Sequence, residues 1–147
     1  MAEPTTKVSY IFDQAIKLMD EQSDSGTAVW SDTVEYQNRA IAILNALIGE
    51  CYPYSDTYSI DAPGKRPIAK PVFTMDDVVQ LDDSIAKSVL PYGLSAELIK
   101  NDDPMLGNYF LQRYQELLAR HAKTLPAAWD TIEDVYGVVD HSSFARW

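Results

Sequence analysis

The run MDDVVQLDD carries the residues best suited to chemistry, two pairs of aspartates: Asp76, Asp77, Asp82 and Asp83. Paired aspartates on helices bind magnesium in some all-α enzymes that act on diphosphates, because hard cations prefer carboxylate oxygens. Such a motif usually needs another acid one helical turn further on. Here Gln80 and Ala86 stand four residues after the first acid of each pair. The spacing favours a turn and a helix cap, and leaves a small metal-dependent hydrolase as the alternative function.

Other groups with chemical potential do not form a recognisable site in the sequence. A Gly-rich nucleotide loop, a Gly-x-Ser-x-Gly elbow and a His-Glu-x-x-His motif are all absent. His121 and His141 have no second ligand at metal-binding spacing, and His121 is expected near a helix C-terminus, where it complements the dipole. The single cysteine, Cys51, lies on the apolar side of a predicted helix and is interpreted as a small buried hydrophobe. We therefore predict no catalytic residue, no metal and no cofactor.

The charge balance limits the classes of partner. The chain of 147 residues has 22 acids against 12 bases, a formal charge of −10. Binding of nucleic acid through its phosphates needs clustered Lys and Arg, so that function is disfavoured. A negative surface serves solubility, and it also suits passive passage of DNA. The sequence has no apolar run long enough for a membrane span, and its start, MAEPTTKVSY, lacks the apolar region of a signal peptide.

The interval from Leu81 to about residue 99 predicts an amphipathic helix. Asp82 or Asp83 is expected to cap its start. An apolar stripe at helical spacing follows and comprises Ile85, Val89, Leu90, Leu94, Leu98 and Ile99. Pro91 interrupts it, because proline lacks an N–H and clashes with the carbonyl four residues back. We expect a kinked helix or two separate helices.

A second helix is predicted from Asp103 and Pro104 to about residue 120. An acid followed by proline is typical of a helix start. The expected buried face consists of Leu106, Phe110, Tyr114, Leu117 and Leu118. With only about four residues between the two helices, they should form an antiparallel hairpin at the centre of the core.

Two earlier intervals complete the predicted fold. Apolar residues at helical spacing predict helices over about residues 5–22 and 32–51, and Asp32 or Thr33 is a candidate cap for the latter. The apolar residues of 32–51 are dense enough for a central helix. Together these features predict an all-α bundle of about four helices in one domain, residues 1–124, followed by a C-terminal arm, residues 125–147.

Two segments have unusual composition. Residues 52–74 contain four of the eight prolines and three of the nine tyrosines, and form a long loop that is either mobile or a partner-binding arm. Its extended part at 68–70 is a candidate for pairing with a neighbouring subunit. The C-terminal arm, residues 125–147, is too apolar for a solvated tail, so it should dock on the chain's own helices or insert into another molecule. The candidate interface residues are Tyr54, Tyr58, Ile68, Val72, Phe73, Trp129, Tyr136, Phe144 and Trp147.

The order of these features resembles a family of small structural proteins of tailed bacteriophages, the head–tail connector or adaptor proteins. The resemblance is carried by LDDSIAKSVLPYGLSAELI, the turn NDDP, and the following MLGNYFLQRYQELL. The earlier NRAIAILNALIGECYPY is similar to the family's second helix running into its long loop. The arm IEDVYGVVDHSSFARW resembles that of relatives from phages and prophages of Gram-positive hosts.

The resemblance implies a non-enzymatic assembly protein of the virion, present in the host cytoplasm during assembly. Adaptors of this family form a homo-oligomeric ring beneath the portal protein, next to tail or stopper proteins, and DNA passes through the ring. An extended loop and a C-terminal arm reach neighbouring subunits or the portal, which here implies residues 52–74 and 125–147. A tail-completion protein is a further alternative with the same composition.

Overall fold

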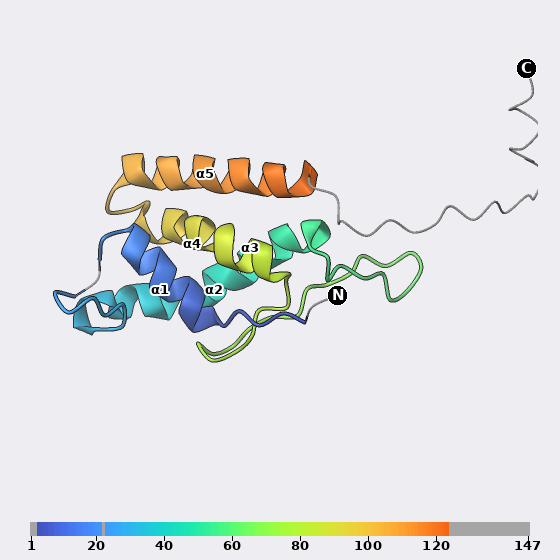
Figure 1. Cartoon of the computed structure of the whole chain (residues 1–147), viewed down its shortest axis with the longest axis horizontal. Coiled ribbons are helices and arrows are strands. Elements are labelled where there is room, and N and C mark those ends of the chain that lie inside the picture. The colour runs from blue at the N-terminus through green and yellow to red at the C-terminus, as the bar shows by residue number, and fades with distance from the viewer. Residues whose placement is uncertain (1–2, 22, 124–147) are drawn as a thin grey trace, which may run out of the picture.

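The computed structural model describes residues 3–21 and 23–123. Within them the chain is all-α, and the predicted fold class is confirmed (Figure 1). Two short 3-10 turns lie on either side of the second helix, at Ser31–Thr33 and Tyr52–Tyr54. The helices are α1 Val8–Leu18, α2 Val34–Cys51, α3 Asp83–Ser88, α4 Leu90–Ile99 and α5 Pro104–Lys123.

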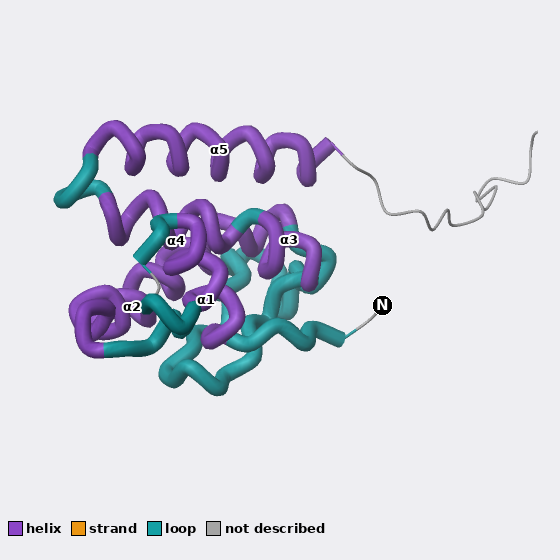
Figure 2. Tube along the Cα trace, turned by 60° about the vertical axis from the view of Figure 1, so that its left-hand side comes forward, coloured by secondary structure: helices purple, strands orange, loops and turns teal. Residues whose placement is uncertain are grey.

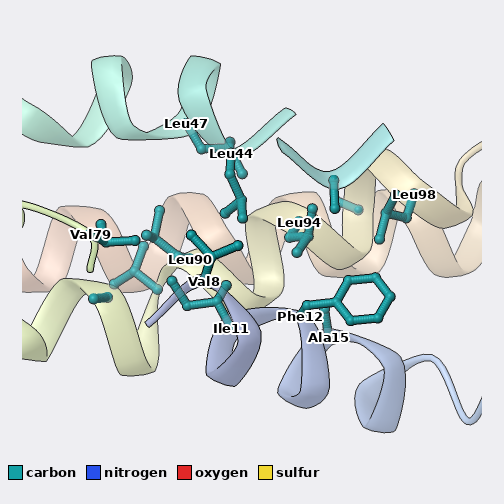
Figure 3. Packing of buried hydrophobic residues seen from close by; sticks show 14 of the residues in the cluster. Val8, Ile11, Phe12, Ala15, Leu44, Leu47, Val79, Leu90, Leu94 and Leu98 are labelled. Carbon is teal, nitrogen blue, oxygen red and sulfur yellow. The ribbon is translucent and has the colours of Figure 1, made fainter. Parts of the chain in front are cut away.

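Helix α4 is the centre of the bundle, and eight of its ten residues are buried. It contacts α1, α2, α3 and α5, so every other helix packs on it. Figure 3 shows Leu90, Leu94 and Leu98 between side chains of α2 on one side and of α1 on the other. The expectation that residues 32–51 would be the central helix is therefore wrong. Helix α2 keeps an exposed polar face, whereas in α4 only Tyr92 and Glu97 are partly exposed.

Pro91 separates α3 from α4, which resolves the alternatives predicted for this position. Helix α3 ends at Ser88, Val89 lies between the helices, and Pro91 becomes the second residue of α4. Near the start of a helix its fixed φ fits and its missing N–H costs nothing. One turn later the buried Ser95 hydroxyl donates to the Pro91 carbonyl at 2.7 Å.

Helix α1 is shorter than the predicted interval of residues 5–22. Before it, backbone groups pair with the segment that precedes α3: the Val79 N–H donates to Thr6 O at 2.9 Å, and the Val8 N–H to Asp77 O at 3.0 Å (Figure 2). After it, Asp20 adopts a left-handed conformation with φ of 60°, which ends the helix. The apolar periodicity of the sequence reveals neither the backbone pairing before α1 nor the left-handed residue after it, so it predicts a helix that is too long.

The capping predictions have mixed outcomes. Asp82 caps α3, accepting from the Ile85 N–H at 2.9 Å, and Asp103 accepts from the Leu106 N–H at 3.1 Å at the start of α5. Neither predicted residue caps α2 with its side chain. Thr33 is the residue before that helix, but its hydroxyl donates to the Ala28 carbonyl at 2.8 Å and so closes the preceding turn.

Helix α5 forms an outer layer on one edge of the bundle and runs antiparallel to α4 (Figure 1). Four residues, Lys100–Asp103, join the two helices, as predicted. Two glycines allow the close approach. A Cβ on Gly107 would lie 3.0 Å from Lys100 Cα, and one on Gly93 would lie 2.9 Å from the Tyr114 ring.

We predict that Gly93→Ala lowers the free energy of unfolding by about 1–3 kcal/mol, because the added methyl group overpacks the contact of α4 with Tyr114 and Leu47. Gly49→Ala is the matched control. A Cβ at Gly49, on the exposed side of α2, meets nothing within 4 Å, so this change should stabilise the helix by about 0.5–1 kcal/mol. Urea unfolding of both variants measures the difference, and equal midpoints would contradict the close packing.

Candidate partner-binding surface

The long segment between α2 and α3 is a loop whose two ends are tied together. The Asp82 N–H donates to Ser55 Oγ at 2.9 Å, and Thr57 Oγ1 donates to the Gln80 carbonyl at 2.9 Å. The Asp56 N–H donates to Asp82 Oδ2 at 3.2 Å. These bonds form a neck, residues 55–57 against 80–82, which sets the loop apart from the bundle as in a compact surface loop.

The returning part of this loop is fixed to α2 through one side chain. Asn45 Oδ1 accepts from the Val72 N–H at 2.8 Å, and Asn45 Nδ2 donates to the Val72 carbonyl at 2.9 Å. The amide thus bonds both backbone groups of Val72, as a neighbouring strand would. Val72 is 1% exposed and belongs to the core of its own chain, so its prediction as an interface residue is replaced by a structural role.

The N-terminal segment is fastened to the start of α3 by Asp83. Its carboxylate accepts from the Thr5 N–H at 2.9 Å and the Thr6 N–H at 3.1 Å, and from both threonine hydroxyls at 2.7 Å. These four hydrogen bonds hold the pKa of Asp83 well below its usual range, the backbone bond from Thr5 being the largest cause. The carboxylate therefore acts as a charged clasp between the two segments.

The part of the loop beyond the neck projects from the bundle (Figure 1). We call residues 59–70 the projecting loop. It exposes two large aliphatic side chains, Ile60 at 67% and Ile68 at 90%. Gly64 turns the chain with φ of 77°, and Lys65, Arg66 and Lys70 are exposed on the same loop. An acidic protein thus presents three of its twelve bases together with exposed aliphatic groups on a single loop.

The other predicted interface residues fall into two groups. Tyr54, Tyr58 and Phe73 are exposed at 48%, 38% and 75%, at the two ends of the loop. Tyr58 also packs edge-on against Tyr52, with ring centroids 5.1 Å apart. The predicted contacts in the arm lie outside the described residues: Trp129, Tyr136, Phe144 and Trp147.

Sequence reasoning missed several exposed apolar residues. Ile60 stands in the same loop as Ile68, and its position between polar residues was the available signal. Met105 and Tyr109, exposed at 84% and 57%, lie on the outer side of α5. The pairing of residues 68–70 with a neighbouring subunit stays a prediction, and the isolated bridge within the described chain joins Lys7 and Val78.

The aspartates of the predicted alternative have separate structural partners. Asp77 accepts from the Phe73 and Thr74 N–H groups at 2.7 and 3.0 Å, and the Phe73 bond is the largest cause of its lowered pKa. Asp76 is exposed, 3.9 Å from the Lys7 ammonium. Asp82 caps α3 and Asp83 fastens the N-terminal segment, so three of the four aspartates bond to separate backbone groups. Among residues 3–21 and 23–123, no group of three or more His, Cys, Asp or Glu is placed to hold a metal ion.

Cys51 is buried, as predicted, and belongs to a small polar cluster. Its Sγ lies 3.3 Å from the Tyr114 hydroxyl, which in turn donates to Glu50 Oε2 at 3.3 Å. Burial raises the pKa of the thiol to about 11. Burial, then the bond to Cys51, raises the pKa of Tyr114 as well. The pair joins α2 to α5 in its neutral form, which is the form that a dry interior favours.

His121 has a more specific position than the predicted helix end. Its Nε2 lies 3.5 Å from Asp82 Oδ2, so the last turn of α5 meets the cap of α3. The same carboxylate thus belongs to the loop neck, the α3 cap and the α5 terminus. This junction fixes the end of α5 against the start of α3.

No family model, curated protein or solved structure matches the chain. In the described residues, no helix is both long enough and apolar enough to cross a membrane.

We predict that Asp83→Asn loosens the N-terminal segment and lowers the midpoint of urea unfolding at pH 7. The folded pKa of Asp83 is depressed, so its contribution is complete above the unfolded value of about 3.8 and is lost as pH falls through the folded value. The difference between wild type and variant should therefore shrink below about pH 4. Faster amide exchange at Thr5 and Thr6 gives a local measurement.

Asp76→Asn is the matched control, since this exposed aspartate has only a long contact to Lys7. It removes the same charge from the same sequence run and should leave the midpoint nearly unchanged. A variant at Asp83 that is no less stable than the control would overturn the role of the clasp.

Native Cys51 should resist labelling by a thiol reagent at pH 8, because its thiol is buried and its raised pKa keeps it protonated. The rate of labelling should follow the rate at which the helical bundle opens. Complete and rapid labelling in denaturant is the control, and since Cys51 is the chain's single cysteine the signal is unambiguous. Rapid labelling of the folded chain would contradict the burial.

Proposed function

We propose that this protein is a structural assembly protein, a head–tail connector adaptor of a tailed bacteriophage or prophage. In this role copies of the chain assemble as a ring under the portal protein, beside tail or stopper proteins, and form part of the channel for DNA. The support is the sequence resemblance together with an all-α body built around a helical hairpin. The protein would act in the host cytoplasm during assembly and then in the virion.

The projecting loop is the observation that carries the proposal. Its two ends are joined by side-chain to backbone bonds at the neck, and Ile60 and Ile68 beyond the neck are not buried in their own bundle. Exposing two large aliphatic residues to water is unfavourable, by about 25 cal/mol for each Å² of apolar surface. Such a pair on a loop that also carries charge is typical of an interaction surface. A second copy or the portal would cover it.

The distribution of charge supports contact between copies. The chain has a formal charge of −10, while Lys65, Arg66 and Lys70 lie on the projecting loop. A basic loop is attracted to the acidic body of a neighbouring copy and so defines a head-to-tail direction, as a closed ring requires. The remaining acidic surface would repel DNA phosphates and let a duplex pass without adhering.

The hydrolase alternative receives no support from the geometry of the described residues. It needs several carboxylates converging on one cation. Asp77, Asp82 and Asp83 instead bond to different backbone segments, and Asp76 is exposed with only a long contact to the Lys7 ammonium.

The test is to mix the full-length chain with the portal protein encoded beside it and look for rings by electron microscopy. We expect a ring on the portal that weakens as salt rises, because ionic contacts between exposed groups are screened. The double variant Ile60→Asp/Ile68→Asp should abolish the ring. Absence of binding at every salt concentration would overturn the proposal.

Val34→Asp is the matched control for this experiment. Val34 is also an exposed aliphatic residue, at 48%, but it lies at the start of α2, away from the loop. An aspartate there favours the helix dipole, so the fold should be kept. Rings from the control and none from the loop variant would assign the contact to the projecting loop, and equal loss in both would remove that assignment.

A further inference from the structure

A groove with basic edges lies where α1, the α3–α4 break and α5 meet. It has a volume of about 320 Å³, and its floor includes Leu18, Tyr92 and Leu117. Lys87 and Arg113 stand at its edge. Lys87 also lines a second hollow, together with Lys7 and Tyr10. We call the first depression the basic groove.

The charge of this groove is opposite to that of the molecule. Within the described chain, Lys87 forms no ion pair, and the Arg113 guanidinium has a 3.5 Å contact with Glu116 on its own helix. The half-buried apolar floor and the two cations fit an acidic segment that also carries apolar anchors. In a protein of net charge −10, such a site selects for negative partners.

The chain itself contains an acidic segment that also carries apolar anchors. Residues 129–136, WDTIEDVY, have three acids and no Lys or Arg. Trp129, Ile132 and Tyr136 recur three and four residues apart, the spacing of anchors in helix-in-groove recognition. The segment lies outside the described residues, immediately after α5.

The chain between α5 and residues 129–136 is short, which favours docking of this segment in the groove of its own molecule over the groove of a second copy. Leu117 on the groove floor is six residues before the end of α5 at Lys123, about 9 Å along the helix. The next six residues reach Trp129 and span at most about 20 Å when extended, enough to fold back over that distance. A segment tethered in this way has an effective concentration in the millimolar range, far above that of a second copy in dilute solution.

We propose that residues 129–136 dock in the basic groove of their own molecule in the isolated protein. Trp129, Ile132 and Tyr136 cover the apolar floor, and the carboxylates of Asp130, Glu133 and Asp134 face Lys87 and Arg113. This docking does not rest on the proposed function, since it concerns the chain before any assembly. If the ring forms, release of the segment would free the arm for a partner.

A disulfide trap tests the proposal in the full-length chain. Ser88→Cys places a thiol at the exposed edge of the basic groove, and Thr131→Cys places one in the segment. Mild oxidation should link them within one molecule, detected as a cross-linked peptide at monomer mass. The buried Cys51 should not compete.

A second groove of similar size supplies the matched control. It lies on α2 beside α4, has a volume of about 380 Å³, and has an apolar floor, but its edge carries Glu50 and Glu97. Ala46→Cys, on this acidic groove, with Thr131→Cys should cross-link at least about five- to tenfold less. Equal linking at the two grooves, or a disulfide found only at dimer mass, would overturn docking within one molecule.

Charge reversal supplies a second, independent measurement. Lys87→Glu with Arg113→Glu should reduce the linking rate and the amide protection of residues 129–136 by about five- to tenfold. Adding Asp130→Lys, Glu133→Lys and Asp134→Lys should restore both. Lys65→Glu with Lys70→Glu makes the same charge change on the projecting loop and should have no effect. Unprotected amides in the wild-type chain, or protection insensitive to the reversal, would overturn the proposal.

Discussion

The burial of α4 among four other helices is the constraint on which the remaining structure depends. Ten residues, Leu90–Ile99, contact four other helices, so each of these helices is positioned by the same short element. Pro91 makes this possible, because the break before α4 lets α3 and α4 take different directions. Gly93 then lets α4 approach Tyr114, which couples the outer helix to the centre.

A bundle this small cannot bury the thirty-odd residues between α2 and α3, and polar side chains organise them instead. Asn45 substitutes for a strand, Ser55 and Thr57 close the neck, and Asp83 fastens the N-terminal segment. Each bond satisfies a backbone group that would otherwise need water or secondary structure. The result is a fixed base from which residues 59–70 project, the arrangement that an assembly surface needs.

Charge is distributed unevenly over this frame. Acids exceed bases by ten, yet exposed bases gather on the projecting loop and at the groove between α1, α3 and α5. Both places combine cations with apolar side chains, so both suit acidic partners with apolar anchors, and the chain supplies such surfaces itself. Contact between copies through residues 59–70 and docking of residues 129–136 within one molecule thus have the same physical basis. In both, complementary charge selects the contact.

The sequence by itself determined the all-α class and the approximate helical intervals, the hairpin with its four-residue turn, the burial of Cys51, the cap at Asp103 and a cap at either Asp82 or Asp83. These features depend on periodicity and on neighbours within a few residues, and such information is local. Only the tertiary structure decided that Val72 is buried, that Asp83 is a clasp, and that Lys87 and Arg113 meet at one groove. Their partners are distant along the chain, from 27 residues between Asn45 and Val72 to 78 between Thr5 and Asp83. No local pattern encodes which distant backbone group a polar side chain will bond, because the packing of the helices around α4 determines which groups lie close together.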